Sequence, residues 1–156
     1  PKRLARKRLH QCRKRPPFFR PVPLRARADW WSEARQCGFL AALYVTGSVA
    51  AAARSVGMSR ESAFRLRARA SAESFARAWD LVQRAWFGDL PAPKEDFRKV
   101  TLFELNRRLE TDLVQPVIYR GRMCAIRRKP DNSALFRLLR RTGGGCDSCG
   151  PEGAEW

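Results

Sequence analysis

The chain has 156 residues, of which 32 are Lys or Arg and 15 are Asp or Glu, so its formal net charge is +17. No apolar run is long enough to cross a bilayer, and a single histidine leaves little material for acid–base catalysis or for most metal sites. We therefore expect a soluble, intracellular protein that binds a polyanion in the cytoplasm, is not an enzyme and uses no cofactor or metal.

The positive charge is concentrated in two parts of the chain. Residues 1–28 contain 11 Lys or Arg and no acid, and residues 115–142 contain eight basic residues against one acid. Between them, residues 71–114 hold seven basic and eight acidic residues. A surface that serves only solubility mixes the two signs more evenly, so two basic flanks around a neutral middle indicate nucleic-acid binding.

Residues 1–29 are expected to form a basic N-terminal arm. Lys and Arg dominate this segment, and four prolines between positions 16 and 23 interrupt any helix. Phe18 and Phe19 are candidates for docking the arm on the folded body. The arm either contacts DNA or is a disordered tail that adds solubility, and block charge of this kind favours contact with DNA.

A first helix is expected from about residue 30 to Thr46, where Gly47 supplies a left-handed exit. Asp29 or Ser32 is the candidate N-cap. Apolar residues recur at intervals of three and four, which predicts an amphipathic helix with one buried face. That face consists of Trp31, Ala34, Cys37, Gly38, Leu40, Ala41, Leu43, Tyr44 and Val45.

Two short helices follow at Val49–Val56 and Arg60–Arg69, with Ser48 and Ser59 as caps and Gly57 between them. This spacing is typical of a helix-turn-helix, in which two helices meet through a turn of three or four residues that usually contains Gly. Small residues are needed where the helices cross, and apolar residues must brace the turn. The residues that meet these demands are Ala52, Ala53, Val56, Met58, Ala63 and Leu66.

The remaining elements are a helix at Glu73–Trp86, a helix at about 100–114 capped by Thr101, a hairpin at 116–128 and a last helix before Gly143. The last helix is capped by Asp131, Asn132 or Ser133. The fourth helix is expected to bury Phe75, Ala78, Trp79, Val82 and Trp86.

The expected fold is mainly α. It consists of a homeodomain-like helix-turn-helix bundle at 30–87 and a small helix, β-hairpin and helix unit at 98–142. The second unit is a candidate for self-association or for binding a partner, and residues 143–156 form a flexible tail.

The outward side of the Arg60–Arg69 helix carries the candidate DNA-reading residues. Arg60 and Arg65 are candidate guanine readers, because arginine makes bidentate contacts with O6 and N7. Glu61 either accepts from cytosine or steers a neighbouring arginine, and Phe64 either touches a thymine methyl or packs against the fourth helix. Ser59 brings the helix N-terminus towards a phosphate. The candidate phosphate contacts are Arg54, Arg67 and Arg69.

Two segments resemble a known group of proteins. Residues 39–80 contain TGSVAAAA, VGMSRESAFRLR and FARAWD in order, and residues 116–140 begin with PVIYRG. Together they resemble bacterial, prophage-related proteins similar to phage terminase small subunits. The resemblance implies an oligomeric adaptor that recognises a DNA-packaging site and hands the DNA to a separate ATPase. It places Ser59, Arg60 and Arg65 at the DNA, although Phe64 stands where the group often has Tyr.

Two other chemistries are set aside. Cys146 and Cys149 are spaced as in a zinc site, but such a site needs four ligands and no second C-x-x-C is present. Cys37 and Cys124 are expected to be small core residues. A nuclease or transposase needs carboxylates gathered around a metal, and the acids of this chain are spread along it.

We therefore expect sequence-selective binding of double-stranded DNA, strengthened by the basic arm, in the cytoplasm at the nucleoid. A transcriptional regulator of similar shape remains an alternative and predicts a dimer on a palindromic operator. A third hypothesis is a basic protein associated with RNA or membrane, for which RNA or anionic lipid outcompetes duplex DNA.

Overall fold

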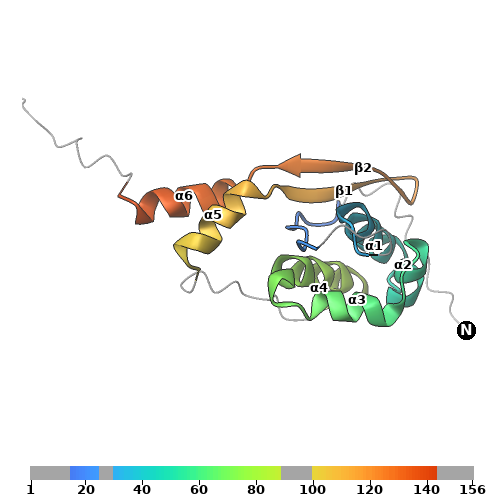
Figure 1. The fold of residues 1–156 in the computed structure, drawn as a ribbon. Coiled ribbons are helices and arrows are strands. Elements are labelled where there is room, and N and C mark those ends of the chain that lie inside the picture. The colour runs from blue at the N-terminus through green and yellow to red at the C-terminus, as the bar shows by residue number, and fades with distance from the viewer. Residues whose placement is uncertain (1–14, 25–29, 89–99, 144–156) are drawn as a thin grey trace, which may run out of the picture. The chain divides into compact units, whose positions relative to one another are not determined.

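The computed structural model describes residues 15–24, 30–88 and 100–143, which form six α-helices and one antiparallel hairpin (Figure 1). The chain is mainly helical, as expected. It divides into two compact units, called the first unit (Pro1–Glu95 with Leu113–Lys129) and the second unit (Asp96–Asp112 with Pro130–Trp156).

Several expectations fall outside the described residues. They are the ends of the basic arm at 1–14 and 25–29, most of the loop after Gly88, and the tail from residue 144 onwards with Cys146 and Cys149.

Helix α1 (Glu33–Thr46) begins where Ser32 accepts a hydrogen bond from the Arg35 amide and ends at Gly47, whose φ is 69°. Its buried face differs from the expected one. Ala34 is exposed, whereas Phe39 is fully buried although it was not assigned to that face. The helix packs against other elements on two sides, so its buried stripe is broad: Gln36, Cys37, Phe39, Leu40, Ala41 and Leu43.

Helices α2 (Val49–Ser55) and α3 (Arg60–Arg67) begin at the expected caps, since the Ser48 and Ser59 side chains accept hydrogen bonds from the amides three residues later. The helices end one and two residues earlier than expected. A 3-10 turn, η1 (Ala70–Ala72), then leads into α4 (Glu73–Phe87).

Helix α4 buries four of the five residues that the sequence assigned to the core, but Trp86 is 42% exposed and that assignment was wrong. The Trp86 indole N–H donates to the Tyr44 carbonyl at 2.8 Å. Its ring lies against Gly47, where an added Cβ would stand 2.8 Å from a ring carbon. Trp86 therefore packs on the surface at the C-terminal end of α1 and is not part of the core.

The core of the first unit is an aromatic cluster that includes part of the expected arm. Phe19 is fully buried, and its ring centroid lies 5.7 Å from that of Phe75. The Phe19 backbone pairs with Val114 in both directions, at 2.9 and 2.8 Å. The buried Gln36 amide binds the Val22 backbone through both its oxygen and its nitrogen. The docking expected of Phe19 is confirmed, and residues 15–24 belong to the folded unit.

The hairpin consists of β1 (Leu113–Tyr119) and β2 (Arg122–Lys129). Its turn residues Arg120 and Gly121 have φ of 49° and 77°, and two-residue turns of type I′ require positive φ at both positions. Cys124 is a bulge, since the register passes from Val117 opposite Ala125 to Ile118 opposite Met123.

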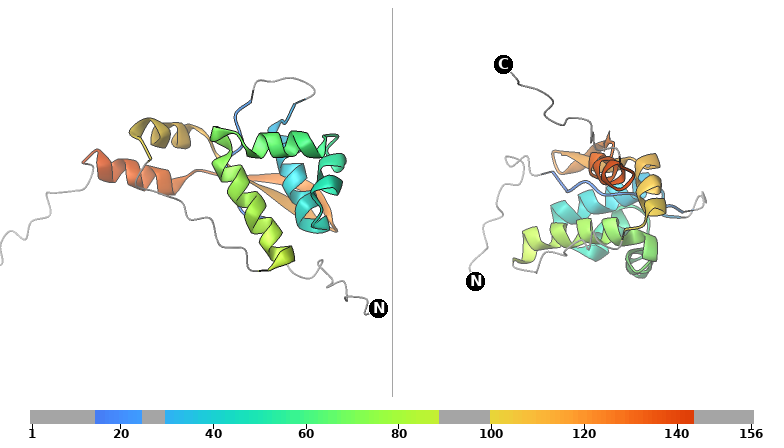
Figure 2. Two further views of the ribbon diagram at one scale, coloured as in Figure 1. Left: turned by 90° about the horizontal axis from the view of Figure 1, so that it is seen from below. Right: turned by 90° about the vertical axis from the view of Figure 1, so that its left-hand side faces the viewer.

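The hairpin belongs to the first unit, whereas the sequence analysis grouped it with the helices on either side of it. Val114 is fully buried in the aromatic core, and Met123 and Ile126 pack against that core. Helix α1 lies between two layers, with the hairpin on one side and α3 and α4 on the other (Figures 1 and 2). The hairpin depends on its packing against α1 and the core, because an isolated two-stranded hairpin is marginally stable at best.

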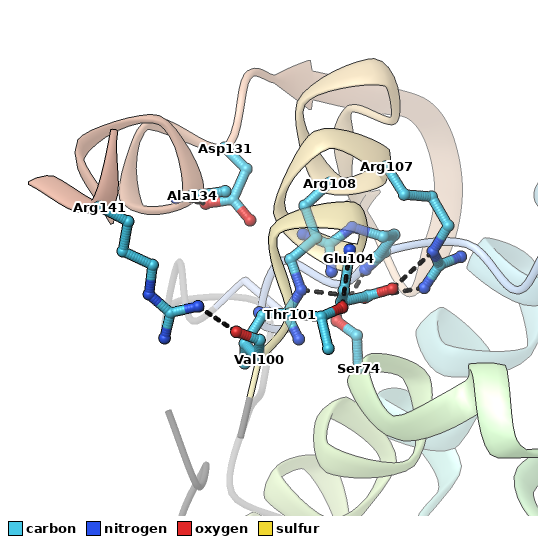
Figure 3. Close-up of polar contacts among 10 residues, drawn as sticks. Ser74, Val100, Thr101, Glu104, Arg107, Arg108, Asp131, Ala134 and Arg141 are labelled. Atoms are coloured by element: carbon cyan, nitrogen blue, oxygen red, sulfur yellow. Dashed lines mark hydrogen bonds and ion pairs between the residues drawn. The ribbon is translucent and has the colours of Figure 1, made fainter. Parts of the chain in front are cut away.

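The second unit contains α5 (Leu102–Glu110), capped by Thr101, and α6 (Asn132–Arg141), capped by Asp131. Leu105 and Ala134 are its buried residues within the described ranges. Figure 3 shows Glu104 between Arg107 and Arg108, which donate to its carboxylate at 2.8 to 3.1 Å. These hydrogen bonds, chiefly from Arg107, lower the pKa of Glu104 from 4.5 to about 2.

Glu104→Gln is expected to lower the free energy of unfolding near pH 6 by roughly 1–3 kcal/mol. Hydrogen bonds to a charged group contribute about 1.5–3 kcal/mol, and the partial exposure of Glu104 reduces this through solvent screening. Because the pKa is lowered on folding, the stabilisation is complete above pH 4.5 and is lost as pH falls towards about 2. Urea unfolding followed by circular dichroism should therefore separate the two proteins near pH 6 and not near pH 2. A difference that is independent of pH would contradict this account.

Candidate nucleic-acid interface

The turn between α2 and α3 fixes the start of α3. Gly57 has φ of 72°, and a Cβ there would meet nothing within 4 Å, so the conformation, not crowding, favours glycine. The Met58 amide donates to the Ala53 carbonyl at 2.9 Å. The Trp31 indole N–H donates to Ser62 Oγ at 2.6 Å and links the first turn of α3 to the residue before the N-cap of α1.

Helix α3 has one buried side and one exposed side. Ala63 and Leu66 are 0% and 2% exposed, as expected for the inward face. On the other side, Glu61 and Arg65 face solvent, with side chains 83% and 82% exposed and 3.8 Å between their charged groups. Such an exposed pair contributes little stability. Arg65 therefore reaches solvent with Glu61 beside it.

Arg60 and Phe64 are neighbours on the exposed side of α3. The Arg60 guanidinium carbon lies 5.6 Å from the Phe64 ring centroid. The Phe64 ring is also 5.4 Å from the ring of the buried Trp79 on α4. Phe64 is 40% exposed, so one part of it packs on the fourth helix and another part faces solvent. Phe64 therefore packs against the fourth helix, which was one of its two expected roles, and the rest of its ring stays exposed to solvent.

The candidate phosphate contacts have different surroundings. Arg67 pairs with Asp80 of α4 at 2.6 Å and lies 5.5 Å from the Trp79 ring, so it holds α3 against α4. The Arg69 guanidinium carbon lies 5.3 Å from the ring of Trp30. Arg54 is exposed on α2, and its Nε donates to the Ala50 carbonyl at 3.4 Å. Arg54 and Arg69 remain at the surface beside α3.

The structure adds a basic surface that the sequence analysis did not select. Tyr119, Arg120, Arg122 and Arg127 are exposed on the hairpin. Strict alternation along β2 would put Arg122 and Arg127, five residues apart, on opposite faces. The bulge at Cys124 brings both side chains to the same face, which the sequence pattern did not indicate. The place of the hairpin in the first unit depends on long-range contacts, such as the pairing of Phe19 with Val114, which the sequence does not display.

The cysteines in the described residues differ in exposure. Cys37 is buried as expected, and its burial raises the pKa of the thiol to about 12. Cys124 is exposed at the hairpin bulge, so its assignment to the core was wrong.

Within 15–24, 30–88 and 100–143, no three His, Cys, Asp or Glu residues are grouped as metal ligands. The helices of these ranges include none with the length and apolarity to cross a bilayer.

Comparison of the chain with protein-family models, with curated proteins and with solved structures gives no match.

Proposed function

We propose that this protein binds double-stranded DNA sequence-selectively through a helix-turn-helix formed by α2 and α3. The observation that carries the proposal is the two-sided character of α3. Its inward side is anchored by Ala63 and Leu66, while Arg60 and Arg65 stand exposed on the other side. An anchored helix with outward arginines in its first and last turns fits the major groove, which is about 12 Å wide.

The residues around α3 have separate roles in this proposal. Arg60 and Arg65 contact guanine edges, which carry the sequence information. Arg54, Arg69 and the amides at the Ser59-capped end of α3 contact phosphates, which position the protein without specifying a sequence. Arg67 acts within the protein by orienting α3 on α4. The charge of +17 supplies additional, sequence-independent attraction.

A finer role follows from the resemblance of residues 39–80 and 116–140 to proteins similar to phage terminase small subunits. We propose an adaptor that marks a DNA site for a separate ATPase. A transcriptional regulator is the second candidate, because an anchored α3 serves both roles equally. The symmetry of the bound DNA site separates them, since a regulator dimer requires a palindromic site.

We further propose that the second unit mediates self-association. Five of its large apolar side chains are 40% exposed or more, with Phe103 at 79% and Phe136 at 61%. A pair of short helices buries too little surface to be stable alone. Its described residues carry five arginines and four acids, so two copies meet there without strong repulsion. The five apolar residues are Leu102, Phe103, Leu135, Phe136 and Leu139.

Light scattering on the full chain is expected to give a dimer or a larger assembly that Phe103→Glu with Phe136→Glu converts to monomer. Phe87→Glu is the matched control, because Phe87 is 69% exposed but belongs to α4 of the first unit. A wild-type protein that stays monomeric at micromolar concentrations, or an assembly unaffected by the double change, would contradict self-association through α5 and α6.

DNA binding itself is tested by fluorescence anisotropy of a labelled duplex, with duplex RNA and anionic lipid vesicles as competitors. We expect duplex DNA to compete best. We also expect affinity to fall by roughly a thousandfold or more between about 50 and 200 mM salt if six or more phosphates are contacted. Stronger competition by RNA or by vesicles would contradict DNA as the partner and would support the third hypothesis.

A further inference from the structure

The outer face of the β1–β2 hairpin concentrates basic and aromatic side chains. Tyr119 is 64% exposed and stands opposite Arg122 across the strands. The Arg120 guanidinium carbon lies 5.3 Å from the Tyr119 ring centroid. Arg127 is exposed five residues further along β2, beyond the bulge. The face therefore presents one aromatic ring among three arginines.

These arginines differ from Arg128 and Lys129, the last two residues of β2. Arg128 pairs with Glu33 at 2.5 Å, and the Lys129 amino group lies 4.2 Å from the Phe18 ring centroid. Arg128 and Lys129 therefore stabilise the packing of the hairpin on the rest of the first unit. Arg122 and Arg127, in contrast, form no ion pair with any residue in the described ranges. Their charge is available to an external anion.

The hairpin and α3 lie on opposite sides of the first unit. In Figure 1 the hairpin is above α1, and α3 and α4 are below it; the right-hand view of Figure 2 shows the same order. Packed layers are spaced by about 10 Å, so the hairpin and α3 are roughly 20 Å apart from centre to centre, and their outward faces are further apart. Duplex DNA has a persistence length of about 500 Å. A duplex seated on α3 therefore does not bend around the unit to reach the hairpin.

We propose that the outer face of the hairpin binds a second duplex, so that one protein molecule bridges two DNA segments. Arginines contact phosphates without regard to sequence, and a two-stranded ribbon fits the major groove as a helix does. The inference rests on the proposed function of α3, because that helix holds the first duplex. The second contact is then electrostatic and sensitive to salt.

Bridging is measured with the full chain loaded on a bead-bound duplex, by capture of a second duplex that carries a fluorophore. We expect capture by the wild type and a reduction of at least about tenfold in a hairpin variant that removes three charges. The variant combines Arg120→Asn, Arg122→Thr and Arg127→Thr, because Asn tolerates positive φ and Thr suits a strand. Its affinity for the bead-bound duplex should change by less than about threefold.

A charge-matched control removes three arginines of α1 and α4, which have no assigned contact with DNA, and should keep bridging: Arg35→Ser, Arg77→Ser and Arg84→Ser. Full bridging by the hairpin variant would overturn the inference and assign the second duplex to an oligomer or to the arm. Wild-type protein that binds one duplex and captures no second one would also overturn it, leaving the proposed function intact. Wild-type protein that binds no duplex would refute both proposals.

Discussion

Replacing Arg60 and Arg65 together by alanine is expected to remove the preference for one DNA sequence over another while leaving weak, salt-sensitive binding. Each bidentate arginine–guanine pair contributes about 1–3 kcal/mol of discrimination, so the loss is about 30-fold or more. The remaining charge still attracts the duplex without regard to sequence. Competition between a selected and a scrambled duplex measures the change directly.

A matched control is available on the opposite side of the unit. Arg122→Thr with Arg127→Thr removes the same number of charges from exposed positions, and the selected sequence should still be preferred. If the α3 variant kept the wild-type preference, or if the hairpin pair lost it, the assignment of α3 as the recognition helix would be refuted.

Trp79→Ala is expected to lower the free energy of unfolding by about 3–5 kcal/mol, as for other large-to-small changes in cores. Trp79 is fully buried, with ring centroids of Phe39 and Phe64 at 4.7 and 5.4 Å. The same indole packs under Arg67, which fastens α3 to α4. Because total stabilities are about 5–15 kcal/mol, denaturant unfolding should show a large shift, and DNA affinity should fall with it.

Trp79→Phe separates the role of the ring from that of the indole N–H. The Trp79 N–H is buried and has no hydrogen-bond partner among the described residues, so phenylalanine removes an unsatisfied donor while keeping an aromatic ring. We expect less than half the effect of alanine. An alanine variant as stable as the wild type would show that this aromatic cluster does not form the core.

Local signals explain why the helices were largely predictable. Five cap residues named as candidates accept hydrogen bonds from the amides three residues later: Ser32, Ser48, Ser59, Thr101 and Asp131. Gly47 and Gly57 have the positive φ that makes glycine favourable after a helix. These features depend on residues a few positions apart, which a single sequence displays. The ends of the helices were less accurate because fraying depends on tertiary contacts.

Long-range contacts explain what the sequence did not show. Phe19 pairs with Val114, 95 positions away along the chain, so neither the docking of residues 15–24 beside β1 nor the unit of the hairpin follows from a local pattern. Arg67 was interpreted as a phosphate contact because the sequence does not show that its guanidinium donates to the Asp80 carboxylate of another helix. Trp86 has the sequence spacing of a core residue, but its ring packs at the surface against Gly47, which has no side chain in its way.

The most direct test of the account is selection of duplexes from a random pool by the full chain, at about 150 mM salt, where the screening length is about 8 Å. We predict an enriched motif that contains guanines and that disappears when Arg60 and Arg65 are both replaced by alanine. Recovery of unrelated sequences, with binding that vanishes as salt rises, would mean that charge alone drives binding and would contradict recognition by α3.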